Sequence, residues 1–327
     1  MSKPKVALYW CASCGGCEET VVDLQEGILD VVGLIDIILW PVALDFKYKH
    51  IEEMEDNSIA VSFINGAIRT SEQEEVAKLL RKKSQLVIAF GSCAAFGGIP
   101  ALANLTNKQK IFDVSYFNSP SVDNPDKVKP EHKTQINGYE LELPNFYETV
   151  YKLDDVIDVD YYIPGCPPTS KLFGSAVIDI LEGKLPAKGA VLAPNKALCS
   201  SCTRNETKPT TVTIDSIKRV IDVELDAEKC FLTQGVICMG PATRDGCGQS
   251  CINGNMPCTG CFGPIEYSKK YSIDQGAKMI ATLGGILQGE SDKEIKNVMN
   301  QIVDPAGTFY KYGISASLLG NARKEDL

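Results

Sequence analysis

Short apolar runs alternate with amphipathic segments through the first half of the chain. Five runs rich in Val, Ile and aromatic residues predict β-strands over 5–10, 35–40, 58–64, 85–90 and 159–163. These runs are almost continuously apolar, which is typical of strands buried on both faces of a sheet. The segments between and after them predict helices over 18–30, 71–83, 145–153 and 169–181. Ser71, followed three residues later by Glu74, indicates a capping box at the start of the second of these helices.

This alternation predicts an α/β fold with a doubly wound parallel sheet, which binds ligands in the loops at the carboxyl ends of its strands. The pattern ends near residue 185. We therefore expect an α/β domain over 1–185, an irregular cysteine-rich domain over 186–265 and a helical tail over 266–327. The tail contains an apolar helical pattern at 277–287 and a charged one at 291–302, and we expect it to cover the cysteine-rich domain or a partner. The turn-rich stretch 97–144 is either a surface insertion or a loop that contacts a partner.

Composition and charge argue against a nucleic-acid-binding protein and against a membrane-spanning one. The chain has 327 residues, a formal net charge of −9, thirteen cysteines and only two histidines. An acidic protein is a poor match for nucleic acid. The longest apolar stretch, 28–44, is interrupted by Asp30, Asp36 and Pro41, and no secretion signal is recognisable at the start. We therefore expect a cytoplasmic protein without a membrane span, in which cysteines serve metal or redox chemistry rather than disulfides.

Cysteines follow three of the predicted strands. Cys11, Cys14 and Cys17 come after the first strand, Cys93 after the fourth and Cys166 after the fifth, all in glycine-containing loops. The ends of parallel strands lie along one edge, so these thiols are predicted to converge. Four thiolates hold a 4Fe–4S cluster. One of the three early cysteines is surplus, and the spacing alone does not identify it. The alternative is a set of buried structural cysteines.

The remaining eight cysteines lie between residues 185 and 264. They are Cys199, Cys202, Cys230, Cys238, Cys247, Cys251, Cys258 and Cys261. Eight thiols suffice for two tetrads, although the sequence does not show how they pair. Zinc is the main rival metal, because two C-x-x-C pairs are typical of zinc ribbons. The flanking Gly, Pro and apolar residues favour desolvated iron–sulfur centres instead. Beside Cys17, Glu18 and Glu19 are predicted to be exposed first-turn residues rather than a proton relay.

Three motifs, in this order, carry a family resemblance. They are Cys-Gly-Gly-Cys-Glu at 14–18, Gly-Ser-Cys-Ala-Ala-Phe-Gly-Gly at 91–98 and Pro-Gly-Cys-Pro-Pro at 164–168, followed by the eight-cysteine region. The combination resembles the small subunit of nickel–iron hydrogenases. Further segments, at 40–47, 234–243 and 257–264, are similar to the cytoplasmic methyl-viologen-reducing type associated with heterodisulfide reductase.

The resemblance implies three 4Fe–4S clusters: a proximal one in a flavodoxin-like domain over 1–185, and two in a ferredoxin-like domain over 186–265. Carried over by motif, Cys14, Cys17, Cys93 and Cys166 would bind the proximal cluster, which leaves Cys11 as the surplus thiol. Chain order then suggests Cys199, Cys202, Cys230 and Cys238 for the distal cluster, and Cys247, Cys251, Cys258 and Cys261 for the medial one. Periplasmic members often have a histidine where Cys199 stands and only three medial cysteines, so this chain departs from them.

The resemblance also implies partners. The nickel–iron centre would lie in a large subunit, and an iron–sulfur adaptor subunit and a heterodisulfide reductase complex would receive the electrons. One alternative is the small subunit of a deazaflavin-reducing hydrogenase. Another is the cluster subunit of a complex-I-like quinone reductase, which shares Pro-Gly-Cys-Pro-Pro but usually lacks the eight-cysteine region. A zinc-stapled interaction module without redox activity is the third alternative.

Overall fold

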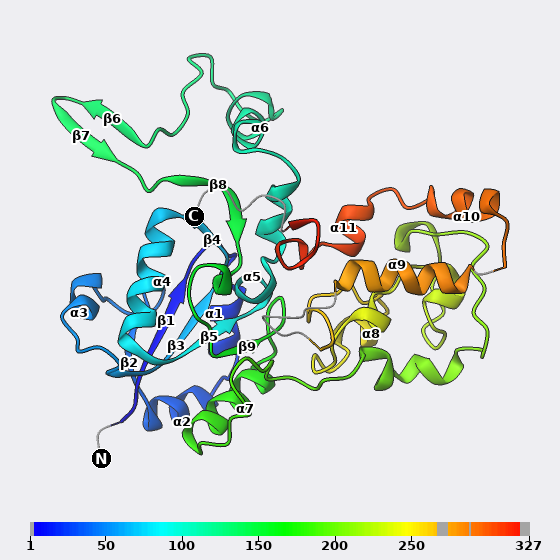
Figure 1. The fold of residues 1–327 in the computed structure, drawn as a ribbon, viewed down its shortest axis with the longest axis horizontal. Helices are drawn as coiled ribbons and strands as arrows, with labels where there is room; N and C mark the ends of the chain where they lie inside the picture. Colours follow the sequence, from blue (N-terminus) through cyan, green and yellow to red (C-terminus); the bar gives the residue numbers. More distant parts are fainter. Residues whose placement is uncertain (1–2, 267–273, 288, 321–327) are drawn as a thin grey trace.

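A parallel sheet forms the centre of the first domain. The computed structural model describes residues 3–266, 274–287 and 289–320. Its sheet contains β1 (Lys5–Trp10), β2 (Asp36–Leu39), β3 (Ile59–Asn65), β5 (Ser84–Phe90) and β9 (Tyr161–Ile163), in the order β2-β1-β3-β5-β9 (Figure 1). Counted within the sheet, this is the 2-1-3-4-5 order of flavodoxin-like folds. All five predicted strands and the doubly wound α/β fold are therefore confirmed.

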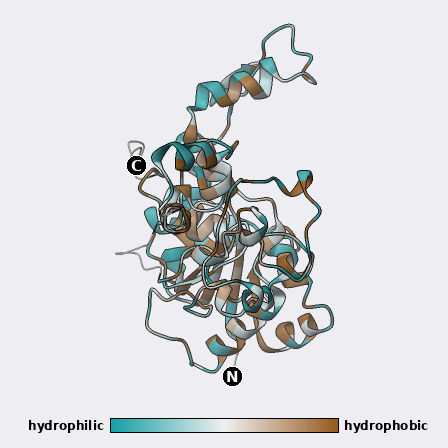
Figure 2. Cartoon of the chain, turned by 90° about the vertical axis from the view of Figure 1, so that its right-hand side faces the viewer, coloured by the Kyte–Doolittle hydropathy of each residue, from teal (hydrophilic) through white to brown (hydrophobic). Residues whose placement is uncertain are grey.

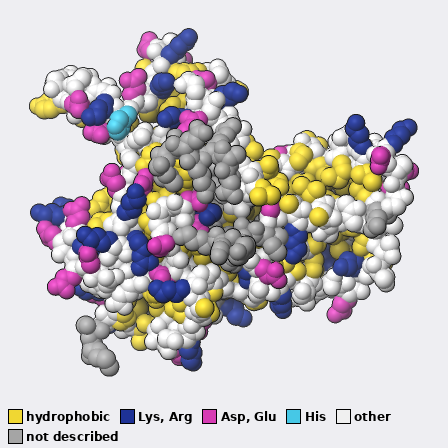
Figure 3. Space-filling model, in the orientation of Figure 1, with side chains coloured by type: hydrophobic (Ala, Val, Ile, Leu, Met, Phe, Trp, Pro, Cys, Tyr) yellow, Lys and Arg dark blue, Asp and Glu magenta, His cyan; other side chains and the backbone are white. Residues whose placement is uncertain are grey.

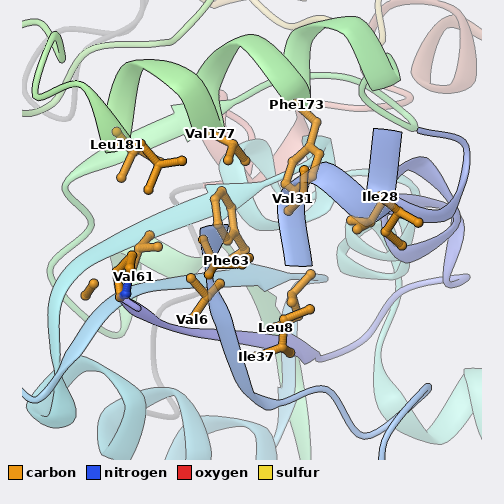
Figure 4. Close-up of a pocket in the computed structure, with 15 residues that line it drawn as sticks. Val6, Leu8, Ile28, Val31, Ile37, Val61, Phe63, Phe173, Val177 and Leu181 are labelled. Atoms are coloured by element: carbon orange, nitrogen blue, oxygen red, sulfur yellow. The ribbon is translucent and has the colours of Figure 1, made fainter. Parts of the chain in front are cut away.

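Helices cover both faces of the sheet. On one face, β1 contributes Ala7 and Tyr9 to a core shared with α3 (Tyr48–Glu52), α4 (Ser71–Lys83) and α5 (Ser92–Phe96). On the other face, Val6 and Leu8 pack with α1 (Gly16–Val22), α2 (Gly27–Leu34) and α7 (Ser170–Leu181). Figure 4 shows this second core, where Phe63 and Phe173 lie with their ring centroids 5.3 Å apart beside a small apolar cavity of about 30 Å³.

The strand register aligns the carboxyl ends of four strands. Trp10 of β1 pairs with Asn65 of β3, Asn65 pairs with Phe90 of β5, and Phe90 pairs with Ile163 of β9. The loops that follow β1, β5 and β9 therefore leave the sheet side by side. These are the three loops that carry the cysteines of the first domain.

Two predicted helices are wrong. The segment predicted as one helix over 18–30 is split into α1 and α2, because Gln25 adopts a left-handed conformation with a φ of 54°. The segment predicted as a helix over 145–153 contains strand β8 (Phe146–Tyr151), which pairs antiparallel with β4 (Ile68–Thr70). The run Phe-Tyr-Glu-Thr-Val-Tyr is rich in aromatic and β-branched residues, which favour strands.

The helix predicted over 71–83 is α4, but its cap differs from the prediction. Thr70 is the N-cap residue, and its hydroxyl accepts a hydrogen bond from the backbone N–H of Gln73. The side chain of Gln73 completes the capping box by accepting from the N–H of Thr70. Glu74, the predicted partner of Ser71, instead forms an ion pair with Lys78.

Most of the stretch 97–144 protrudes from the α/β domain (Figures 1 and 2), but its first part packs on that domain, where Ala101 is fully buried and Asn104 donates a hydrogen bond to the backbone oxygen of Val150. It contains the 3-10 helix Ile99–Leu105, α6 (Lys108–Asp113), the π-helical turn Val114–Asn118 and a hairpin of β6 (Lys133–Ile136) and β7 (Tyr139–Glu142). All eight residues of the hairpin strands are exposed. The protruding part mixes hydrophilic and hydrophobic residues (Figure 2).

The cysteine-rich region has little regular structure of its own. Its described elements are short 3-10 turns and α8 (Ser250–Asn253). The tail helices α9 (Gln275–Ile286), α10 (Asp292–Met299) and α11 (Pro305–Phe309) supply its missing core. Met279, Leu283 and Phe309 pack with Leu198 and Phe231 in one cluster, so these helices do cover the cysteine-rich region.

Several large apolar side chains are exposed on the surface. Hydrophobic side chains gather over the lobe formed by the cysteine-rich region and the tail helices (Figure 3), where Ile221 and Val303 are among the exposed apolar residues. Within the residues that the structure describes, no helix is long and apolar enough to cross a membrane. The two boundaries between the three predicted domains stay predictions.

Candidate functional site

The structure brings Cys14, Cys17, Cys93 and Cys166 together at the aligned strand ends, and we call them the proximal tetrad. Burial raises the pKa of the Cys17 thiol, and the nearby thiols of Cys93, Cys166 and Cys14 raise it further. Burial also raises the pKa of Cys93 to about 12, and Cys166 and Cys14 add to the shift. These mutual effects show that four thiols from three separate loops lie near one another.

Glycines leave room for these thiols. Gly91 has a φ of +87°, and a Cβ atom added there would lie 2.3 Å from Cys17 Sγ. Gly98 has a φ of +58°, and its added Cβ would lie 2.5 Å from Cys93 Sγ. Both contacts are too short for any side chain, so the glycine-rich motif at 91–98 keeps the space around the tetrad open.

Glu18 is buried, which overturns the prediction of an exposed first-turn residue. The residue is only 3% exposed, and its carboxylate accepts hydrogen bonds from Trp40 Nε1 and from Asn65 Nδ2, the latter at 2.7 Å. Burial raises the pKa of this carboxyl, and the two hydrogen bonds oppose the shift. Trp40 and Asn65 lie at the ends of β2 and β3, so Glu18 ties the first turn of α1 to the sheet.

Cys11 is separate from the proximal tetrad. It is buried in the core on the α3–α5 face of the sheet, whereas Cys17 packs in the core on the opposite face. Burial alone raises its pKa, without a contribution from another thiol. Its position is that of a structural cysteine.

A second group, the distal tetrad, consists of Cys199, Cys202, Cys230 and Cys238. All four line a cavity of about 40 Å³, together with Arg204 and Lys208. Burial raises the pKa of the Cys199 thiol to about 12; Cys238, Cys202 and Cys230 also raise it, whereas Lys208 lowers it. At Gly240 an added Cβ would lie 3.2 Å from Cys199 Sγ, so this glycine also leaves room beside thiols.

The third group, the medial tetrad, consists of Cys247, Cys251, Cys258 and Cys261. All four line a cavity of about 260 Å³ that also includes Cys166 of the proximal tetrad. Burial raises the pKa of Cys261 to about 12, and the thiols of Cys247, Cys166 and Cys251 contribute to the shift. The medial tetrad therefore lies next to the proximal one.

Direct contacts connect the three tetrads. The hydroxyl of Ser92, beside Cys93, donates a hydrogen bond to the backbone oxygen of Cys261. The same hydroxyl accepts from the N–H of Gly165, beside Cys166, at 3.2 Å. The backbone N–H of Cys258 donates to Cys238 Sγ at 3.4 Å, which joins the medial and distal tetrads. The order in space is thus proximal, medial, distal.

Among the described residues, no three His, Cys, Asp or Glu side chains come close enough to hold a single metal ion. Sequence reasoning missed two buried arginines in this region, Arg204 and Arg244. Arg204 lies two residues after the Cys199–Cys202 pair, and a cation so close to a cysteine pair was a signal in the sequence. Nothing in the pattern showed that either side chain would be buried.

The chain has close relatives among known hydrogenase proteins. A family model described as NADH ubiquinone oxidoreductase, 20 Kd subunit, matches residues 14–180. The iron-sulfur subunit of an F420-non-reducing hydrogenase from Archaeoglobus profundus is 38% identical, over 96% of this chain and 97% of that protein. The corresponding F420-non-reducing hydrogenase subunit of Methanothermobacter thermautotrophicus is 36% identical, over 97% of this chain and 96% of that protein.

Among solved structures, the oxidized recombinant NiFeSe hydrogenase of Desulfovibrio vulgaris Hildenborough has a similar fold. The TM-score is 0.54 at 16% sequence identity, and the match covers 84% of this chain and 99% of that one. The similarity extends beyond the α/β domain, because 84% of the chain includes more than its first 185 residues.

Proposed function

The chain belongs to the small subunits of F420-non-reducing nickel–iron hydrogenases, within the wider NADH ubiquinone oxidoreductase 20 kDa subunit family, and from this premise we propose that it is their electron relay. As a hydrogenase subunit it is part of an oxidoreductase. In the proposed role, electrons from a nickel–iron site in the large subunit cross this chain through three 4Fe–4S clusters.

The observation that carries the proposal is the continuous arrangement of the three tetrads. Each supplies four cysteines from converging loops, which is the ligand set of a 4Fe–4S cluster. Cys166 lines the medial cavity, and Cys258 hydrogen-bonds a distal thiol. Clusters held in these tetrads would each take up and release one electron.

The residues around the tetrads fit such groups. Cys14, Cys17, Cys93 and Cys166 would hold the proximal cluster, Cys247, Cys251, Cys258 and Cys261 the medial one, and Cys199, Cys202, Cys230 and Cys238 the distal one. Gly91, Gly98 and Gly240 keep side chains away from the sulfurs. The apolar core that α9 and α11 build over the region excludes water, and this limits reorganisation when charge changes.

We further infer the partners. The large subunit would supply the nickel–iron centre, since the cysteines of this chain are used by the tetrads and by Cys11. An iron–sulfur adaptor subunit and heterodisulfide reductase would receive the electrons, in the cytoplasm. The deazaflavin F420 is a weaker candidate for the acceptor, because the full-length relatives are described as F420-non-reducing.

The first experiment is an analysis of iron, zinc and acid-labile sulfide in anaerobically purified protein. About twelve irons and twelve sulfides per chain, with little zinc, are expected for three 4Fe–4S clusters. About two zinc ions and little sulfide would overturn the relay in favour of a zinc-stapled interaction module.

A matched pair of variants tests the proximal assignment. Cys166→Ala should remove about four irons per chain and stop transfer of electrons from hydrogen to viologen in the assembled complex. Cys11→Ala should keep the iron content of the wild type, because Cys11 lies in a separate core. An unchanged rate in Cys166→Ala, or a loss of about four irons in Cys11→Ala, would refute the assignment.

A further inference from the structure

Arg204 is a buried cation beside the distal tetrad. It follows Cys202 in the 3-10 helix Thr203–Thr207, is 5% exposed and lines the same cavity as the four distal cysteines. Its guanidinium carbon lies 4.2 Å from the ring centroid of Phe231, the residue after Cys230. The arginine and the ring beneath it therefore both belong to cysteine-bearing loops of this tetrad.

All hydrogen-bond acceptors of Arg204 are neutral. The guanidinium donates to the backbone oxygens of Asp226, Lys229 and Ile252 at 3.2–3.3 Å, and to Asn255 Oδ1 at 2.9 Å. In the described parts of the chain, none of the ion pairs includes it. The four oxygens hold the arginine in place but leave its positive charge uncompensated.

An uncompensated buried charge is costly, and a fold tolerates it where an anion binds nearby. Four thiolates around iron form such an anion. Lys208, an exposed residue that also lines this cavity, adds a second positive charge close to Cys199. Acidic side chains instead lie beside the other tetrads: Glu18 follows Cys17, and Asp245 lies close to Cys247.

We propose that Arg204 is a positioning residue that raises the reduction potential of the distal site, so that electrons entering the chain favour its outer end. This inference rests on the proposed relay function. A fixed positive charge in a water-poor site stabilises the more negative, reduced form of an anionic group. Such a charge would favour movement of electrons from the proximal tetrad outward.

The test is a redox titration of the purified holoprotein, followed by electron paramagnetic resonance. Arg204→Met should lower one of the three midpoint potentials. At a fixed potential, the ratio of reduced to oxidised distal site should fall at least about tenfold, which corresponds to about 59 mV for a one-electron couple. Arg204→Lys keeps the charge and should retain most of the wild-type potential. Equal shifts in both variants would show a structural role and overturn the proposal.

A second variant tests the charge without altering the arginine. Asn255→Asp places a carboxylate on the Arg204 guanidinium in a side chain of almost the same shape, and it should lower the same potential. Lys208→Gln should produce a smaller shift that fades with added salt, because exposed charges are screened. Lys218→Gln, an exposed change outside the distal cavity, is the control and should shift nothing.

The outcomes separate the two proposals. Wild-type protein without reducible iron–sulfur signals would refute the relay itself. Wild-type protein with all its signals, together with unchanged potentials in Arg204→Met and Asn255→Asp, would refute only the role of Arg204.

Discussion

The buried carboxyl of Glu18 offers a sharp test of how the proximal loop is anchored. Glu18→Ala removes the acceptor of two buried donors, Trp40 Nε1 and Asn65 Nδ2. An unpaired buried donor costs about 1–3 kcal/mol. Asn65 Nδ2 keeps one other acceptor, the backbone oxygen of Tyr9 at 3.2 Å, so its loss falls at the lower end of that range. We expect the free energy of unfolding to fall by about 2–4 kcal/mol in total.

The neighbouring residue provides the matched control. Glu19 has the same side chain, lies in the same turn of α1 and is exposed, so Glu19→Ala should change the free energy of unfolding by less than about 0.5 kcal/mol. Urea denaturation of anaerobically purified protein, followed by tryptophan fluorescence, measures both variants. Glu18→Gln keeps one acceptor oxygen and should fall between the two. Equal stabilities of Glu18→Ala and Glu19→Ala would refute the anchoring role.

Two further predictions concern buried polar contacts of the α/β domain. Burial alone would raise the pKa of Asp160, but hydrogen bonds from Lys188, Arg81 and the backbone of Val87 lower it overall. The ionised carboxylate therefore stabilises the fold above about pH 4, and this contribution is lost as the pH falls through the lowered pKa. Asp160→Asn should lower the free energy of unfolding by about 2 kcal/mol at pH 7. In urea denaturation, the difference in this free energy between variant and wild type should shrink below about pH 4. A difference that stays constant with pH would contradict the prediction. Ser92→Ala should lower the free energy of unfolding by about 1–3 kcal/mol, because it removes the hydrogen bond to Cys261. The control is Ser13→Ala, which should leave the free energy of unfolding unchanged, because the buried hydroxyl of Ser13 has no hydrogen-bond partner among the described residues. Equal effects of the two substitutions would contradict the bridging role of Ser92.

The sheet could be predicted from the sequence because its strands are buried on both faces. A run such as 59–65 is apolar almost throughout, and only a strand of a parallel sheet or a buried helix has that pattern. The segment 146–151 is harder, because the spacing of its apolar positions also fits one face of a short helix, although its residue types favour a strand. Its pairing with β4, a contact distant in the chain, decides the outcome.

The grouping of the proximal tetrad could also be predicted from the sequence, because it depends on the same parallel sheet. In a parallel sheet, the loops after different strands meet at one edge, so residues as distant as Cys17 and Cys166 can be predicted to converge. The medial and distal tetrads lack that help, because regular strands do not organise the region that carries them. Chain order only suggests their grouping, and their contacts become visible only in three dimensions.

Burial is the property that the sequence conveys least. Glu18 directly follows Cys17, and Arg204 lies two residues after Cys202. Ionisable residues in such loops are usually exposed to solvent. Each is buried because partners distant in the chain, Asn65 for Glu18 and Asn255 for Arg204, complete its hydrogen bonding.

Hydrogen bonds connect the three predicted parts of the chain to one another. Ser92 of the α/β domain contacts Cys261 of the cysteine-rich region, and the tail returns to the α/β domain, where the N–H of Gly98 donates to Tyr312 and the hydroxyl of Ser315 donates to Val150. The tail therefore packs on the cysteine-rich region and on the loop beside Cys93 at once. Because Gly98 lies in the loop that follows Cys93, the tail helps to fix the position of that loop relative to the cysteine-rich region.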